Sequence, residues 1–334
     1  MILNITGLSH SGKSLVSDIL SLRPDIRSFN PGIEFEFFRI PSGFLDLYDI
    51  IKQGGDPIRL NKAFSEFIVA LKRMEKPIVF PYFHRYLTTS GHGYSSVFGK
   101  PYFNMLTEIE KLKSDVSGIY RLDVQTYLFY SFFLFLIEKI RLGMGNISKN
   151  YHHLITSQDF LKFVSNQVHL LYQADKINEI VLLNNAFDLY SLQRSCVKDF
   201  DIPSIIVVRD PRDIWTSLMT TKKVYKPVWE SKSALSIKKT LWPRDIDIFI
   251  EKYLESMKKI ELISSKKMII NFERICMNPD ESYLKICSFL GCKFEPINLL
   301  ELTNNSKLNI GLWRKNYDVN IKKIENSLEE YLYD

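Results

Sequence analysis

The chain contains little glycine, proline or cysteine, the residues that are abundant in collagen-like, disordered and disulfide-rich proteins. Its 334 residues include only 14 glycines, 13 prolines and 4 cysteines. Collagen-like chains need far more glycine, and disordered chains lack a hydrophobic share as high as the 46% found in this sequence. The cysteines show no Cys-x-x-Cys spacing, which argues against a disulfide scaffold, a zinc site or a redox pair and fits reduced thiols in the cytoplasm.

Long apolar segments are also missing. The longest apolar run, from Tyr127 to Ile137, has 11 residues, whereas a membrane span needs about 20. The first six residues lead directly into a glycine-rich turn, without the basic region or cleavage site of a signal peptide. We therefore expect a cytoplasmic protein with no membrane span. The net charge of +6 is too small for a protein that coats nucleic acid, and it suits an anionic ligand.

Short apolar segments alternate with helical patterns along the chain. They are rich in Ile, Val and Phe, and they predict the strands of a parallel sheet covered by helices on both faces. The candidate strands are residues 2–6, 26–29, 78–80, 180–183, 205–208 and 268–271. A helix is predicted from Lys13, with Leu15, Ile19 and Leu22 on one stripe, and Pro24 ends it. The pattern predicts an open α/β sheet.

No repeat, low-complexity tract or glycine/serine linker divides the chain. We therefore expect a single domain over residues 1–334. Residues 103–178 lie between two candidate strands and predict a largely helical insertion that forms a cap.

The strongest local motif lies near the N-terminus. Residues 7–14 read Gly-Leu-Ser-His-Ser-Gly-Lys-Ser and match G-x-x-x-x-G-K-[ST], with a candidate strand before and a helix after. The glycines allow the backbone N–H groups to converge on an anion, and the helix N-terminus adds partial positive charge. The sequence predicts a phosphate-binding loop. His10, inside it, is interpreted either as a contact to a transferred group or as an exposed loop side chain.

A second motif follows the candidate strand at residues 205–208. Arg209 comes directly after this strand, Pro211 ends the strand, and Asp213 is predicted to cap a helix that carries Ser217. Open α/β sheets bind ligands beyond the carboxyl ends of their strands, and an Arg placed there can bind a phosphate group through two donors.

These segments together resemble one known family. Residues 207–213 with Ser217 are similar to the 3′-phosphate-binding segment of sulfotransferases that use 3′-phosphoadenosine-5′-phosphosulfate, where a Ser follows the Arg by eight residues. The phosphate loop stands in the place of the family's 5′-phosphosulfate loop. A C-terminal strand and helix and a late cofactor-binding loop also agree, at residues 269–275, 278–279, 286–291 and 311–315. The resemblance covers residues 2–21 and 180–332 and is closest to soluble bacterial and carbohydrate-type enzymes.

The resemblance implies a P-loop NTPase-like, three-layer α/β fold with a central, mostly parallel sheet. It also implies an enzyme that transfers a sulfuryl group from the nucleotide donor to a hydroxyl or amine of an acceptor, and a carbohydrate is the expected acceptor. The reaction in this family requires no metal ion. Lys13 would neutralise the leaving group, Arg209 and Ser217 would hold the 3′-phosphate, and Arg314 and Lys315 would close over it. The candidate donor-binding residues of the loop are Ser9, His10, Ser11, Gly12, Lys13 and Ser14.

The acceptor's general base has three candidates. Carbohydrate sulfotransferases often carry a carboxylate after the second strand, and Glu34 and Glu36 occupy that place. They alternate with Phe, so both carboxylates point the same way if the segment is extended. His84, after the candidate strand at residues 78–80, is the rival, because other sulfotransferases use a His base.

Two other functions remain open at this level. The loop also resembles that of adenylylsulfate kinases, and an ATP- and Mg²⁺-dependent kinase would need carboxylates such as Asp210 and Glu273 for the metal. A P-loop protein that only binds a nucleotide is the third interpretation.

The excess positive charge is concentrated in one stretch. Residues 219–244 hold seven basic residues and one acidic residue, and the rest of the chain is balanced. This stretch directly follows the predicted 3′-phosphate segment, and its aromatic residues Tyr225, Trp229 and Trp242 suit an anionic glycan as acceptor. A solvated loop with its aromatic side chains packed inward is the other interpretation of this stretch, and lipid and small phenolic acceptors stay open.

Overall fold

The computed structural model describes residues 1–28, 35–54, 57–75, 94–117, 155–175, 179–189, 195–220, 245–263 and 265–333. The chain divides into two compact units. The first comprises Met1–Glu36, Phe80–Ser90 and Ala174–Asp334, and the second comprises Phe37–Val79 and Gly91–Gln173. The first unit holds the described sheet, and the second is helical.

The sheet of the first unit has five strands in the order β2-β3-β1-β4-β5. Every neighbouring pair is parallel. The strands are β1 (Ile2–Gly7), β2 (Ile26–Arg27), β3 (Ile180–Asn184), β4 (Ser204–Val208) and β5 (Lys267–Asn271). The predicted parallel sheet is therefore confirmed, and its predicted strands reappear within a few residues, except that residues 78–80 lie outside the described residues.

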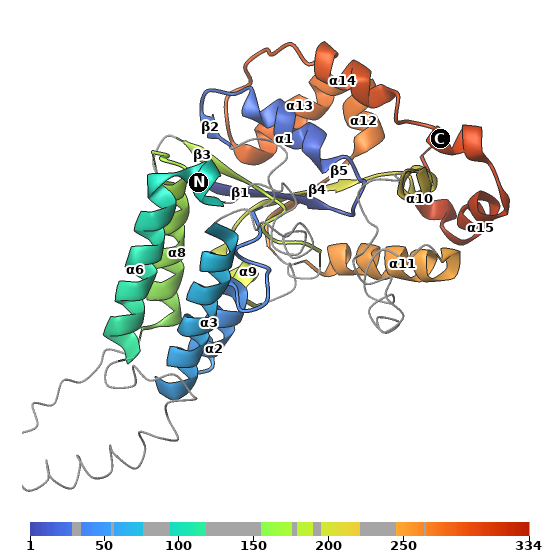
Figure 1. Cartoon of the computed structure of the whole chain (residues 1–334). Helices are drawn as coiled ribbons and strands as arrows, with labels where there is room; N and C mark the ends of the chain where they lie inside the picture. Colours follow the sequence, from blue (N-terminus) through green and yellow to red (C-terminus); the bar gives the residue numbers. More distant parts are fainter. Residues whose placement is uncertain are drawn as a thin grey trace, which may run out of the picture. The chain divides into compact units, whose positions relative to one another are not determined.

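Helices cover both faces of this sheet (Figure 1). On one face lie α1 (Lys13–Ser21), α12 (Phe272–Met277), α13 (Pro279–Leu290) and α14 (Leu300–Lys307), and on the other lie α9 (Ser195–Phe200) and α11 (Ile246–Leu262). Three further helical segments follow β4 or complete the C-terminus: α10 (Pro211–Thr220), α15 (Val319–Ser327) and the short 3-10 helix η2 (Leu312–Asn316), with a last turn at Glu329–Tyr331. The layers are those of a P-loop-like α/β fold.

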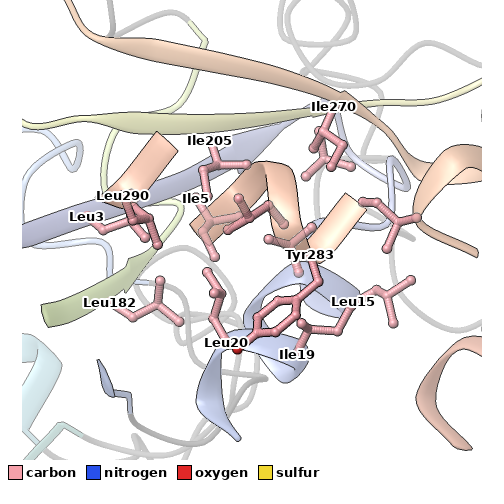
Figure 2. Packing of buried hydrophobic residues seen from close by; sticks show 14 of the residues in the cluster. Leu3, Ile5, Leu15, Ile19, Leu20, Leu182, Ile205, Ile270, Tyr283 and Leu290 are labelled. Atoms are coloured by element: carbon pink, nitrogen blue, oxygen red, sulfur yellow. The ribbon is translucent and has the colours of Figure 1, made fainter. Parts of the chain in front are cut away.

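The core on the α1 face is aliphatic. Figure 2 shows Leu3 and Ile5 of β1 and Ile205 of β4 packed against Leu15 and Ile19 of α1. Tyr283 and Leu290 of α13 complete the same cluster. Burial of this strip holds α1 against the sheet, and because α1 begins after the loop at the carboxyl end of β1, its N-terminus lies near that end.

Strand β1 is less apolar than the sequence pattern predicts. Its other face carries Asn4 and Thr6, which are both fully buried. The amide of Asn4 donates to the carbonyl of Phe187 at 3.1 Å, and the Thr6 hydroxyl donates to Asn185 Oδ1 at 3.0 Å. Buried polar groups are tolerated only with such partners. They tie β1 to the segment that follows β3.

Two other predictions about sheet and helix packing are wrong. Leu22 is not on the buried stripe of α1, since it is the C-cap residue and 49% exposed, whereas Leu15 and Ile19 are buried as predicted, with Val16 and Leu20 beside them. Strand β5 is not covered on both faces, because it lies at the edge of the sheet and Ile269 is 45% exposed.

The second unit packs around aromatic side chains. Its described helices are α2 (Phe44–Lys52), α3 (Pro57–Glu75), α5 (Tyr94–Phe98), α6 (Lys100–Ser117) and α8 (Ser157–Leu171). The rings of Phe44 and Phe67 lie 4.5 Å apart between α2 and α3, and those of Phe37 and Tyr94 lie 4.3 Å apart. This unit begins well before residue 103. The single domain with an insertion at about 103–178 stays a prediction.

Among the residues that the structure describes, no helix combines the length and the apolar character needed to cross a membrane.

Replacing Ile205 by Ala tests the central strand. Ile205 is fully buried, so we expect the free energy of unfolding to fall by about 2–5 kcal/mol, from lost burial and the cavity left behind. Urea denaturation measures this loss. Ile269→Ala, at the exposed edge strand, is the matched control and should lower it by less than about 1 kcal/mol. Equal losses in the two variants would contradict the assignment of the core.

Candidate active site

The predicted phosphate loop lies between β1 and α1. The chain turns where the Ser11 N–H donates to the carbonyl of Leu8 at 3.1 Å, and α1 starts after Gly12. Gly12 is left-handed with φ 86°, and His10 with φ 61°. The backbone N–H groups and the dipole at the N-terminus of a helix favour an anion. The loop therefore has the local form that its sequence predicts.

Both motif glycines are required by close packing. A Cβ on Gly7 would lie 2.3 Å from the carbonyl oxygen of Val207 on β4. A Cβ on Gly12 would lie 2.2 Å from the ring of Phe272, the first residue of α12. The loop thus touches both strand β4 and helix α12, which bring other candidate residues to it.

Arg209 leaves the carboxyl end of β4 and is buried beside the loop. One terminal nitrogen of its guanidinium donates to the carbonyl of His10 at 2.8 Å, and the other donates to the carbonyl of Asn309. The guanidinium also lies 4.8 Å from the centre of the Phe272 ring. Its Nε is buried and has no hydrogen-bond partner among the described residues. Burial lowers the pKa of Arg209, against the opposing effect of Asp213, so the cation is incompletely compensated.

Ser217 and His10 meet at the same place. The Ser217 hydroxyl lies 2.9 Å from His10 Nδ1, although they are 207 residues apart in sequence. Burial lowers the pKa of His10, and the positive charges of Lys13 and Arg209 lower it further, so the imidazole is neutral at pH 7. His10 is thus a partly buried wall residue and not an exposed loop side chain.

These residues line a cavity of about 260 Å³ at the carboxyl end of the sheet. Five of the predicted donor-binding residues belong to it, and five further residues complete it. Its lining residues are His10, Gly12, Ser14, Leu15, Asp18, Arg209, Ser217, Phe272, Ser306 and Asn309. Nearby in the loop, the Ser11 hydroxyl is fully buried and has no hydrogen-bond partner among the described residues. The cavity is positive at Arg209, and Asp18 gives it one negative wall.

Asp18 is the main lining residue that the sequence analysis missed. Burial raises its pKa, and its Oδ1 is buried without a hydrogen-bond partner in the described part of the chain. Its position was predictable, because residues 14 and 18 are one turn apart and share a face of α1. Ser306 and Asn309 carried no such signal, since they come from α14 and the turn after it and approach the loop only through the tertiary fold.

Asp213 does not cap its helix as predicted. Helix α10 begins earlier, at Pro211, so Asp213 lies in its first turn. Asp210 caps the helix instead, because its Oδ1 accepts from the Arg212 N–H at 2.8 Å. Asp213 is nearly fully buried and accepts from the N–H groups of Gly311 and Trp313.

The two carboxylates considered for a kinase metal, Asp210 and Glu273, are held by the protein in different ways. Asp210 pairs with the guanidinium of Arg212 at 2.6 Å and accepts from the Tyr333 N–H. Glu273 accepts from the Asp210 N–H at 2.9 Å, and burial raises the pKa of Glu273 to about 7. Asp210 is thus held by an arginine, whereas Glu273 Oε2 is buried and has no hydrogen-bond partner among the described residues. Within the same part of the chain, no group of three or more His, Cys, Asp or Glu side chains could hold a metal ion.

Arg314 and Lys315 are exposed on η2 and do not line the cavity. The Arg314 guanidinium lies 5.4 Å from the centre of the Trp313 ring, and Arg212 lies 4.1 Å from the same ring. Ser9 and Lys13 flank the lining residues of the loop and are not part of the lining themselves.

Among the general-base candidates, Glu36 lies in the described part of the chain. It is buried and lies in a turn, so the condition that its segment is extended is not met at Glu36. Glu34, His84 and residues 221–244, with Tyr225, Trp229 and Trp242, lie outside the described residues.

A family model described as a sulfotransferase domain matches residues 124–330. The chain belongs to the sulfotransferase family. The match includes the segments of Arg209, Ser217, Arg314 and Lys315 in this sulfotransferase, and residues 7–14 lie before it. It also reaches back to residue 124, into the part of the chain where the sequence analysis found no resemblance.

Three solved sulfotransferase structures are similar over nearly the whole chain. The domain from the olefin synthase of Synechococcus PCC 7002 has a TM-score of 0.43 at 12% identity, covering 100% of this chain and 95% of that chain. The sulfotransferase domain from the curacin biosynthetic pathway has a TM-score of 0.41 at 10% identity, and the match covers 99% of this chain and 98% of that chain. The sulfotransferase STF9 from Mycobacterium avium has a TM-score of 0.39 at 11% identity, and the match covers 98% of this chain and 75% of that chain. No curated protein matches the sequence.

The pKa of Glu273 makes stability depend on pH. Because its pKa is about 7 in the native protein and 4.5 for an ordinary glutamate, the native protein holds a proton that the unfolded chain releases. The bound proton adds about 3 kcal/mol to the free energy of unfolding. This stabilisation is fully present below pH 4.5 and is lost as the pH rises through 7. We therefore expect Glu273→Gln to gain stability relative to the wild type between about pH 5 and pH 8, as measured by urea denaturation.

The control for this effect is Glu251→Gln, at an exposed position of α11. The difference in unfolding free energy between this variant and the wild type should stay flat across the same pH range. A flat difference for Glu273→Gln as well would show that its carboxyl is ionised in the native state.

Proposed function

We propose that this sulfotransferase moves a sulfuryl group from 3′-phosphoadenosine-5′-phosphosulfate to a hydroxyl or amine of a carbohydrate acceptor. The observation that carries the proposal is the cavity that Arg209 and Ser217 share with the phosphate loop. One nucleotide with two anionic ends, at the 5′ and the 3′ position, matches two anion-binding elements that open into a single cavity.

The residues present fit such a donor. Arg209 has a buried Nε without a partner among the described residues, and the Ser11 hydroxyl is likewise unpaired. Buried donors without partners are costly, and phosphate oxygens would satisfy them. Arg209 and Ser217 then bind the 3′-phosphate, and the start of α1 binds the 5′-phosphosulfate. Asp18 repels phosphate, which leaves its side of the cavity to the uncharged nucleoside.

The donor supplies an activated sulfuryl group for an in-line displacement. The protein's part is to position the reactants and to stabilise charge. Lys13 stabilises the negative charge that develops on the bisphosphate side, and the neutral His10 lines the cavity at the same loop. Both act without a metal.

The acceptor side rests on the sequence alone. A base accepts the proton of the attacking group, and Glu34, Glu36 and His84 remain its candidates. The basic stretch at residues 219–244, which begins in the last two residues of α10, suits an anionic glycan. The described thiols of Cys276, Cys287 and Cys292 are free, in keeping with a cytoplasmic location.

Ligand titration by calorimetry tests the donor. We expect adenosine 3′,5′-bisphosphate to bind without metal and more tightly than adenosine 5′-monophosphate, since only the former reaches Arg209. Arg209→Ala should weaken the bisphosphate by about tenfold to a hundredfold and remove this preference, because a charge-assisted contact contributes about 1.5–3 kcal/mol. Arg209→Lys should restore the affinity in part, because Lys keeps the charge but not the planar fork.

Arg274→Ala is the matched control, since it removes the same charge at an exposed position of α12. Its preference for the bisphosphate should equal that of the wild type. Binding of ATP only with Mg²⁺, and no binding of the bisphosphate, would overturn the proposal in favour of a kinase.

A further inference from the structure

One buried carboxylate touches both segments of the predicted 3′-phosphate site. Asp213 Oδ2 accepts from the Gly311 N–H at 2.8 Å, and its Oδ1 accepts from the Trp313 N–H at 3.3 Å. The same Oδ2 lies 3.8 Å from a terminal nitrogen of Arg209. Asp213 therefore contacts the strand-end arginine and, about a hundred residues later in the chain, the loop that leads to Arg314.

The contacts of Arg209 close this arrangement. Its guanidinium donates to the carbonyl of Asn309, two residues before Gly311. Arg209, Asp213 and the backbone at residues 309–313 are thus joined to one another by four separate contacts. Gly311 has φ 72°, a left-handed conformation, and is the N-cap of η2, the element that carries Arg314 and Lys315. The carboxylate of Asp213 therefore fixes where η2 starts.

The electrostatics show how tightly Asp213 is held. Its side chain is 1% exposed. Burial raises the pKa of Asp213, while the hydrogen bond from the Gly311 N–H and the positive charge of Arg209 act in the opposite direction and lower it. A buried carboxylate is tolerated only when donors and a cation surround it. The separation of 3.8 Å from Arg209 exceeds hydrogen-bond distance, so Asp213 supports the cation without using one of its donors.

We propose that Asp213 is a positioning residue that holds Arg209 and the loop at residues 311–315 in one arrangement for the donor's 3′-phosphate. It acts through these residues and does not touch the ligand. The inference rests on the proposed function, because it presupposes that the 3′-phosphate binds at Arg209. A carboxylate that only stabilised the fold would affect every ligand of the cavity equally, whereas a positioning residue affects the 3′-phosphate alone.

Asp213→Asn tests the proposal, with dissociation constants for adenosine 3′,5′-bisphosphate and adenosine 5′-monophosphate measured by calorimetry. Asn has the same size, but it loses the charge beside Arg209 and can turn an amide N–H toward a backbone N–H. We expect the bisphosphate to bind about tenfold more weakly and the monophosphate to change less than about twofold. A parallel loss for both ligands, or no loss for either, would overturn the positioning role.

Glu325→Gln is the matched control. Glu325 also links the C-terminal part of the chain to α10, through Arg212 at 3.1 Å, and its other carboxylate oxygen accepts from the Tyr317 hydroxyl, outside residues 309–313. The ratio of the two dissociation constants should stay at its wild-type value in this variant. A changed ratio would mean that any loosening of the C-terminal part weakens the 3′-phosphate site, which would overturn the specific role of Asp213.

Gly311→Ala probes the same link from the loop side if Asp213→Asn does not fold. The added Cβ meets only the flexible Arg314 side chain, at 3.5 Å, but the left-handed φ becomes strained. A selective loss of bisphosphate affinity supports the proposal, and an unchanged ratio opposes it. A wild-type protein that does not distinguish the two ligands would instead refute the proposed 3′-phosphate site, which separates the two failures.

Discussion

The site depends on the parallel pairing of β1 with β4. Gly7 is paired in register with Val207, so the last residue of β1 lies beside the end of β4. Parallel strands end on the same edge of a sheet, and the phosphate loop and Arg209 therefore emerge next to each other. The close approach of Gly7 to the Val207 carbonyl leaves no room for a side chain, so glycine at position 7 is a condition of this register. The hydrogen bond from Arg209 to the His10 carbonyl follows from the same pairing.

Buried charged side chains around the start of α10 hold the C-terminal part of the chain in place. Asp210 and Arg212 pair with each other and hold the backbone of Tyr333, while Asp213 holds the backbone near Gly311. These ions are surrounded by donors or acceptors, as burial requires. Arg209 differs from them, because its Nε is unpaired among the described residues and it faces the cavity. The charges of Asp210, Arg212 and Asp213 are thus compensated within the protein, whereas the Nε of Arg209 has no hydrogen-bond partner among the described residues.

Much of the site could be predicted from local sequence. The phosphate loop and the Arg209–Ser217 segment are contiguous motifs, and their strands and helices are short apolar patterns, so each can be recognised without knowledge of the rest. The errors arose where a neighbour decided the outcome: Leu22 is exposed because the helix ends there, Ile269 because β5 is an edge strand, and Asp213 serves a loop about a hundred residues away. Asp18 could have been found from its helical spacing to Ser14.

By itself the sequence determined the turn between β1 and α1, the strand-end arginine and the parallel α/β class, because backbone conformation and strand burial depend on nearby residue types. The tertiary structure decided which of these elements meet. The strand order placed Arg209 beside the loop, the packing of α12 and α14 brought Phe272, Ser306 and Asn309 to the cavity, and burial set the pKa of His10 and of Glu273. Such contacts join residues far apart in the chain, and their energies depend on desolvation, which exists only after the chain has folded.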